Sequence, residues 1–200
     1  NDGLGRLAVL DLVSEEATNL LTRAAELAEQ AASGTTTSAG RAALNSEFTQ
    51  IKDALTALDS DTKFDGQEIF GADFQVRVGE ASTETISVSG FSIDSASLSI
   101  STDTLLTSGT ADTALGNILS AIETVSSSRG NVGAKSARLQ TIVNSLGISS
   151  ENITAAESQI RDADIATEVV NLTKFQILSQ SGVSALAQAN QSSQSVLSLL

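Results

Sequence analysis

The feature that most constrains this chain is a row of seven branched apolar residues, each placed seven positions after the one before. The row consists of Ile118, Val125, Val132, Leu139, Leu146, Ile153 and Ile160. A heptad recurrence of this kind indicates a helix whose apolar seam packs against other helices. No proline occurs among the 200 residues, and a proline inside a helix costs about 3 kcal/mol. The sequence therefore predicts one long helix over 111–161.

Two further helices are predicted ahead of this one by apolar residues at spacings of three and four. The first spans 4–32, and the second spans 40–59. A polar, glycine-containing stretch at 33–38 separates them. Because this connection is short, the two helices are expected to pack antiparallel. The predicted fold class is therefore mainly α, an elongated antiparallel helical rod or coiled-coil bundle with a further helix at the C-terminus.

The apolar pattern changes from helical spacing to alternation over 71–101, which we interpret as a small β-hairpin region. The alternating apolar residues of the hairpin are Phe74, Val76, Val78, Ile86 and Val88. Leu98 and Ile100 alternate in the same way, and they predict a third short strand.

Composition excludes most kinds of catalytic and metal chemistry. The chain has neither cysteine nor histidine, which removes thiolate metal sites, the Ser-His-Asp triad and most transition-metal ligation. We therefore expect no enzymatic activity, no catalytic residue, no cofactor and no metal site. The net charge of −13, from 11 basic and 24 acidic residues, disfavours nucleic acid as a partner. No apolar run reaches the length of a membrane-spanning helix, so no membrane partner is expected either.

The C-terminal segment 162–200 differs from the rest in carrying no charged residue after Lys174. Its apolar residues lie among serine, glutamine, asparagine and alanine, without a charged outer face. This composition suits a helix surrounded by other protein, so we interpret it as an assembly segment that is poorly ordered without a partner. The residues assigned to assembly are Val183, Leu186, Val196, Leu197, Leu199 and Leu200.

Several short motifs along the chain are similar to those of one family. Residues 160–169 read IRDADIATEV, and the tail contains AQANQ at 187–191 and VLSLL at 196–200. NDG opens the chain, and FDG occupies 64–66 after the second predicted helix. Together these motifs closely resemble bacterial flagellins, and the resemblance spans nearly the whole chain.

The resemblance implies a structural subunit of the bacterial flagellar filament, secreted to the extracellular flagellum and serving motility. Residues 1–161 would form the outer-tube core and 162–200 a C-terminal inner-tube helix, with other flagellin subunits as partners. The resemblance also implies that a flagellin export chaperone and cytosolic innate receptors bind the tail. Compared with the family pattern, we expect this chain to be N-terminally truncated and to lack large variable outer domains.

The same resemblance implies Toll-like receptor 5 as a further partner. The implied receptor-binding residues are Arg23, Leu27, Glu47 and Ile118. From the residues alone, Arg23 and Glu47 are interpreted as solvated helix charges or as an ion pair, and this alternative stays open. With Ile118 beside them, they are expected to form an exposed patch with an apolar centre and a charged rim.

Two other functions remain as alternatives. A hook–filament junction protein has termini similar to those of flagellins. A cell-surface flagellin homologue that binds polysaccharide would need aromatic platforms in the variable region, for which Phe74 and Phe91 are the candidates.

Overall fold

The computed structural model describes residues 2–79 and 83–197, with side chains described except at 162–164 and 193–197. Two compact units divide the chain, one ending at Asn144 and the other beginning at Ser145. Among the described residues, the first unit contains helices α1 and α2, four short strands and the start of helix α3. The second unit consists of the remainder of α3.

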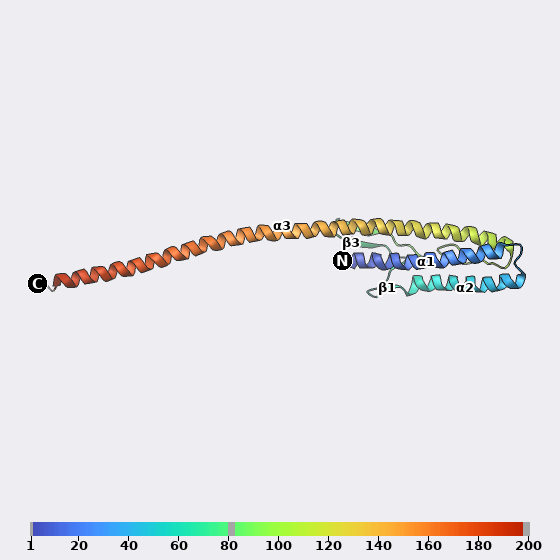
Figure 1. Ribbon diagram of the computed structural model, residues 1–200, viewed down its shortest axis with the longest axis horizontal. Coiled ribbons are helices and arrows are strands. Elements are labelled where there is room, and N and C mark those ends of the chain that lie inside the picture. The colour runs from blue at the N-terminus through green and yellow to red at the C-terminus, as the bar shows by residue number, and fades with distance from the viewer. Residues whose placement is uncertain (1, 80–82, 198–200) are drawn as a thin grey trace. The chain divides into compact units, whose positions relative to one another are not determined.

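Helices α1 (Asp2–Ala32) and α2 (Ser38–Asp61) pack side by side in the first unit (Figure 1). Each presents one apolar face, because its apolar residues recur every three or four positions. At the start of α2, the side chain of Thr37 accepts a hydrogen bond from Gly40 N at 3.1 Å. This cap satisfies an amide that the helix itself leaves unpaired. The sequence thus predicted both helices, with their ends within two residues of the observed ones.

Helix α3 (Ser108–Leu197) begins at a reciprocal cap. Thr107 Oγ1 accepts a hydrogen bond from Thr110 N, and Thr110 Oγ1 accepts one from Thr107 N, both at 3.1 Å. The helix therefore starts three residues before the predicted start at 111. It continues without interruption through residue 161, so the boundary predicted there is not an end of secondary structure. As a division of the assembled protein, that boundary stays a prediction.

The heptad seam of α3 is buried over its first four members only. These members are each at most 3% exposed and share one core with apolar residues of α1 and α2: Ile118, Val125, Val132 and Leu139. The remaining members keep the register but are exposed: Leu146, Ile153 and Ile160. Within this chain the seam is therefore covered as far as Leu139. In the second unit α3 is the only described element, so no other described element covers these side chains.

A two-residue turn joins the short antiparallel strands β1 (Lys63–Phe64) and β2 (Gln67–Glu68). The turn residues Asp65 and Gly66 have φ angles of 52° and 75°. Two successive residues at positive φ form a type I′ turn, a conformation that aspartate and glycine adopt readily. The turn therefore accounts for the Asp-Gly pair within the 64–66 motif.

The predicted hairpin is confirmed as strands β3 (Phe74–Arg77) and β4 (Thr85–Val88), which pair antiparallel. The prediction of a third strand at Leu98 and Ile100 is wrong. The amides of these two residues bond back to carbonyls four and five residues earlier, at 3.1 and 3.0 Å, in a turn. Both side chains are buried, so the alternation reflects two apolar groups that a turn directs into the core.

Residues 91–105, here called the strap, connect the hairpin to α3 without forming a helix or strand. Three polar residues of α2 at heptad spacing hold the strap: Asn45, Lys52 and Asp59. Their partners are main-chain atoms at 2.6–3.0 Å, namely the amides of Ile93 and Leu105 and the carbonyls of Ser101 and Asp103. Apolar side chains of the strap are buried in the core. The strap is thus fixed by polar contacts through its main chain and by apolar contacts through its side chains.

Gly90 lies where two backbone segments approach closely. A Cβ atom at this position would lie 2.6–2.7 Å from main-chain atoms of Ala72. We expect Gly90→Ala to lower the free energy of unfolding by about 1–3 kcal/mol, because the main chain must move. Gly116→Ala has open space around its new methyl group and should raise stability by about 0.5–1 kcal/mol through helix propensity. Urea unfolding followed by circular dichroism measures both, and losses of equal size would contradict this account.

Candidate functional site

Beyond Asn144, the described side chains of α3 are all exposed. Between 165 and 192 they include nine large apolar groups that are 53–67% exposed. These are Ile165, Val169, Val170, Leu172, Phe175, Ile177, Leu178, Val183 and Leu186. Soluble proteins rarely expose so many neighbouring apolar side chains unless they form an interaction surface.

The nine residues form two stripes along α3, because successive helical residues are turned by about 100° around the axis. The wide stripe consists of Ile165, Val169, Leu172, Phe175, Val183 and Leu186. The narrow stripe, on another side of the helix, consists of Val170, Ile177 and Leu178. On one side, uncharged polar residues separate the stripes: Thr173, Gln180 and Ser184. Apolar groups on two sides of one helix are typical of a helix that contacts more than one neighbour.

The assembly residues predicted from the sequence lie partly on these stripes. Val183 and Leu186 belong to the wide stripe and are exposed. The side chains of Val196 and Leu197, at the end of α3, are not described. Leu199 and Leu200 lie outside the described residues. The assembly role of these six residues stays a prediction.

Arg23 joins α1 to α2 through an ion pair at the surface. Its Nη2 atom lies 2.8 Å from Glu47 Oε1, and its Nη1 atom lies 3.0 Å from Glu26 Oε2. Hydrogen bonds to these carboxylates, chiefly to Glu47, raise the pKa of the Arg23 guanidinium. Of the two interpretations of Arg23 and Glu47 from the sequence, the structure shows the ion pair, whereas receptor binding stays a prediction.

The apolar centre expected for this patch is wrong. Leu27 and Ile118 are 1% and 0% exposed and belong to the hydrophobic core. Each lies on the apolar face of its helix, which is the face that packs inward. They cannot contact a partner of the folded chain, so only Arg23 and Glu47 of the four residues are presented at the surface.

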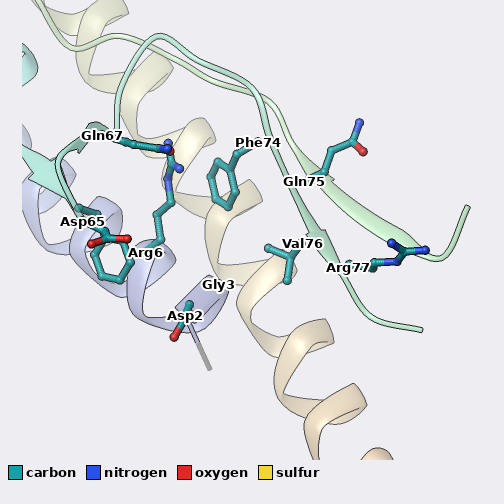
Figure 2. Close-up of a pocket in the computed structure, with 10 residues that line it drawn as sticks. Asp2, Gly3, Arg6, Asp65, Gln67, Phe74, Gln75, Val76 and Arg77 are labelled. Carbon is teal, nitrogen blue, oxygen red and sulfur yellow. The ribbon is translucent and has the colours of Figure 1, made fainter. Parts of the chain in front are cut away.

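An open cleft of about 830 Å³ lies beside the first turns of α1 (Figure 2). Arg6 extends from α1 into it between Gln67 and Phe74. The Nη2 atom of Arg6 donates a hydrogen bond to Glu68 O at 2.9 Å, and its guanidinium carbon lies 4.3 Å from the centre of the Phe74 ring. Arg6 therefore ties α1 to both hairpins. Because this cation is already engaged within the chain, we assign the cleft a packing role.

The two phenylalanines considered as sugar platforms make contacts within the protein. The guanidinium of Arg6 lies over Phe74. Phe91 packs edge-on against Phe70, with the ring centres 5.7 Å apart. A sugar platform requires a free ring face, so neither contact supports a polysaccharide site.

An ion pair between α1 and α3 was missed by the sequence analysis. Arg129 Nε lies 2.9 Å from Asp11 Oδ1, and its Nη2 lies 3.2 Å from Glu15 Oε2. The hydrogen bond to Asp11 is the main reason that the pKa of Arg129 is raised. Arg129 follows the seam residue Val125 by four positions, which is a flanking heptad position where charges pair between helices. The heptad register is therefore the signal that could have revealed this pair.

Carboxylates do not gather into a metal site in the described part of the chain, where no group of three or more potential ligands is found. Asp59 instead accepts a hydrogen bond from Ile93 N at 2.6 Å, and burial raises the pKa of its carboxyl. Its role is to hold the strap. Within the described residues, no helix has both the length and the apolar character needed to cross a bilayer.

Two family descriptions match most of the chain. Residues 1–75 match the bacterial flagellin N-terminal helical region, and residues 115–200 match the bacterial flagellin C-terminal helical region. The two matches cover α1, α2, β1, β2 and all but the first turns of α3, and they therefore include the buried part of the heptad seam and the apolar stripes.

Individual proteins agree with these matches. Flagellin of Halalkalibacterium halodurans is 32% identical over 204 residues, covering 100% of this chain and 75% of its own length. Flagellin FlaB2 of Treponema pallidum is 34% identical over 219 residues, covering 100% and 76%. The crystal structure of Bacillus cereus flagellin aligns with a TM-score of 0.65 at 27% identity, covering 72% of this chain and 85% of that one. This chain therefore belongs to the bacterial flagellins, a family of structural filament proteins rather than enzymes.

Proposed function

We propose that copies of this chain assemble into the extracellular flagellar filament through the wide and narrow stripes of α3. The family supports the role of filament subunit, and the observation that carries the assembly surface is the set of nine exposed apolar side chains. Burying one such side chain contributes about 1.5–3 kcal/mol. Several together exceed the cost of ordering two chains against each other, which is about 4–15 kcal/mol. Residues 162–200 would then form the inner tube and 1–161 the outer tube.

Val183→Asp is expected to abolish filament assembly while leaving the melting temperature of the first unit unchanged. Val183 is 61% exposed on the wide stripe, so a charge there is tolerated in the free chain but is desolvated in an assembled one. Assembly is measured by sedimentation and electron microscopy of the full-length protein. Ser184→Asp is the matched control, since it adds the same charge at the next position on the polar side.

Equal loss of assembly in both variants would show that any added charge disrupts the filament, and would contradict a specific role for the wide stripe. Unchanged assembly of Val183→Asp would remove the stripe from the interface altogether.

Before assembly, the stripes need a partner that keeps them from associating, and a flagellin export chaperone fits that need. An apolar helix face docking in a groove is a common mode of recognition. Secretion through the flagellum and recognition of the tail by cytosolic innate receptors belong to the same proposal. A pull-down with purified chaperone, using the Val183→Asp and Ser184→Asp pair, tests whether the wide stripe is the bound face.

Recognition by Toll-like receptor 5 is a second proposed function, favoured by the surface position of Arg23 and Glu47 on neighbouring helices. Leu27 and Ile118 belong to the core, so they would act only by stabilising the helices of the first unit. We expect Arg23→Ala to weaken receptor binding by roughly 1–3 kcal/mol, as for an interface anchor. Its effect on stability should stay below about 1 kcal/mol, because the ion pair is exposed. Calorimetry with the receptor ectodomain and melting curves measure the two effects.

Arg138→Ala, at an exposed position of α3, is the control for loss of an arginine charge. Equal receptor affinity of the wild type and Arg23→Ala would leave Arg23 as a link between helices only. Weaker binding accompanied by a lower melting temperature would point to the same structural role.

A further inference from the structure

Lys174 is the only charged residue between 169 and 200. It is exposed and lies within the narrow stripe, in a shallow groove that it lines with Val170, Ile177 and Leu178. The groove is otherwise formed by apolar side chains and one threonine. Any neighbour that covers the narrow stripe must therefore also cover the ammonium group of Lys174.

The helix itself offers Lys174 no counter-charge. Residues three and four positions away are the ones that can reach it on the helix surface, and none of these is acidic: Val170, Asn171, Ile177 and Leu178. The nearest carboxylate with a described side chain is Glu168. It lies about 9 Å away along the axis and about 120° around it, as six helical residues require. A pair within one copy is thus ruled out by the geometry of the helix.

Glu168 lies on the wide stripe of α3, and Lys174 lies on the narrow one. By the same helical geometry Glu168 falls among the residues of the wide stripe, near Leu172, Phe175 and Leu186. It is exposed, and no ion pair with another described residue engages its carboxylate. Among the side chains described between 165 and 192, the narrow stripe therefore carries an ammonium and the wide stripe carries a carboxylate.

We infer that Lys174 of one copy pairs with Glu168 of a neighbouring copy, so that the wide stripe of one tail packs on the narrow stripe of the next. The inference rests on the proposed assembly of copies through α3. A charge buried in an apolar contact is strongly unfavourable unless it is paired, so this pairing selects one axial offset. For parallel helices the offset is six residues, or about 9 Å. A slip of one turn separates the two charges, much as a single polar position fixes the register of a coiled coil.

The contact uses two different surfaces of each copy. In such a heterologous contact the first copy keeps its narrow stripe free and the second keeps its wide stripe free, so the contact can extend from copy to copy. Because the charge pair sets an axial offset between copies, the series of contacts does not close into a ring and forms a filament.

Charge reversal tests the pair in the full-length protein. Lys174→Glu and Glu168→Lys, each alone, should raise the critical concentration for assembly by roughly thirtyfold or more, since each places like charges in contact. An equimolar mixture of the two single variants should assemble, because copies that alternate along the filament place opposite charges at every contact. The doubly substituted chain should also assemble, and Lys174→Arg should assemble as the wild type does.

Assembly of Lys174→Glu alone, at wild-type concentrations, would overturn the inference. Assembly of the double variant without assembly of the mixture would also overturn it, because a pair between copies requires the mixture to assemble. Failure of the wild type and of Lys174→Arg to assemble would instead reject the proposed function on which the pair depends. Electron microscopy and sedimentation of the wild type, the variants and the mixture distinguish these results.

Discussion

Leu139→Asp is expected to lower the free energy of unfolding of the first unit by about 3–5 kcal/mol, the cost of a buried charge without a partner. Leu139 is 3% exposed and is the last buried member of the α3 seam. An aspartate there can reach water only if the seam separates from the core that it shares with α1 and α2. Thermal and urea unfolding, followed by circular dichroism, measure the loss.

Leu146→Asp is the control, one heptad further along the same row. Leu146 is 52% exposed, so its substitution should change stability by no more than about 0.5 kcal/mol. A large loss at this position would show that the seam is covered beyond Leu139. A small loss at Leu139 would show that the end of the seam is loosely packed.

Phe48→Ala should cost about 3–5 kcal/mol, the range for removing a large aromatic ring from a core. Phe48 is fully buried on α2. Its ring also lies 5.0 Å from Lys52 Nζ, the group that donates hydrogen bonds to two carbonyls of the strap. We therefore expect the strap amides at Ile93 and Leu105 to exchange hydrogen faster in this variant, in addition to the loss of global stability.

Phe48→Leu separates the two effects of the ring. It retains most of the buried volume, so it should cost only about 1–2 kcal/mol, but it removes the aromatic face beneath Lys52. Faster exchange in the strap with little loss of stability would assign the lysine contact a role of its own. Unchanged exchange in both variants would show that the ring does not position Lys52.

Sequence patterns predicted those elements whose signal is local and repeated. The spacing of Leu7, Leu10 and Leu21 in α1 and of Phe48, Ile51 and Leu55 in α2 marks faces that are indeed buried. Alternation predicted β3 and β4 correctly but failed at Leu98 and Ile100, because inward-facing residues of a turn can alternate as a strand does. A heptad row indicates which face of a helix is apolar, but it does not indicate how far along the helix a partner covers that face. For that reason the exposure of Leu146 could not be foreseen.

The predictions of functional residues also differ in how well the sequence could support them. Apolar residues without accompanying charge predicted an assembly role for Val183 and Leu186; both side chains are exposed in this chain, and the assembly role stays a prediction. The patch around Arg23 was misjudged, because resemblance to a family carries residue identities but no burial. Leu27 and Ile118 have the periodicity of core residues, and that periodicity alone would have placed them inside. Arg6 could not be found from spacing, since its contacts with Glu68 and Phe74 join segments far apart in the sequence.

The strap shows how a surface can change while the fold beneath it stays the same. Asn45, Lys52 and Asp59 bind its main chain, and any residue other than proline can supply the amides and carbonyls that they use. Substitutions at exposed strap positions such as Ser97 and Thr102 are therefore expected to leave these bonds intact, whereas substitutions at the three α2 positions are expected to remove them. An antibody raised against the strap of one strain would lose its epitope in another strain whose filament subunit is equally stable.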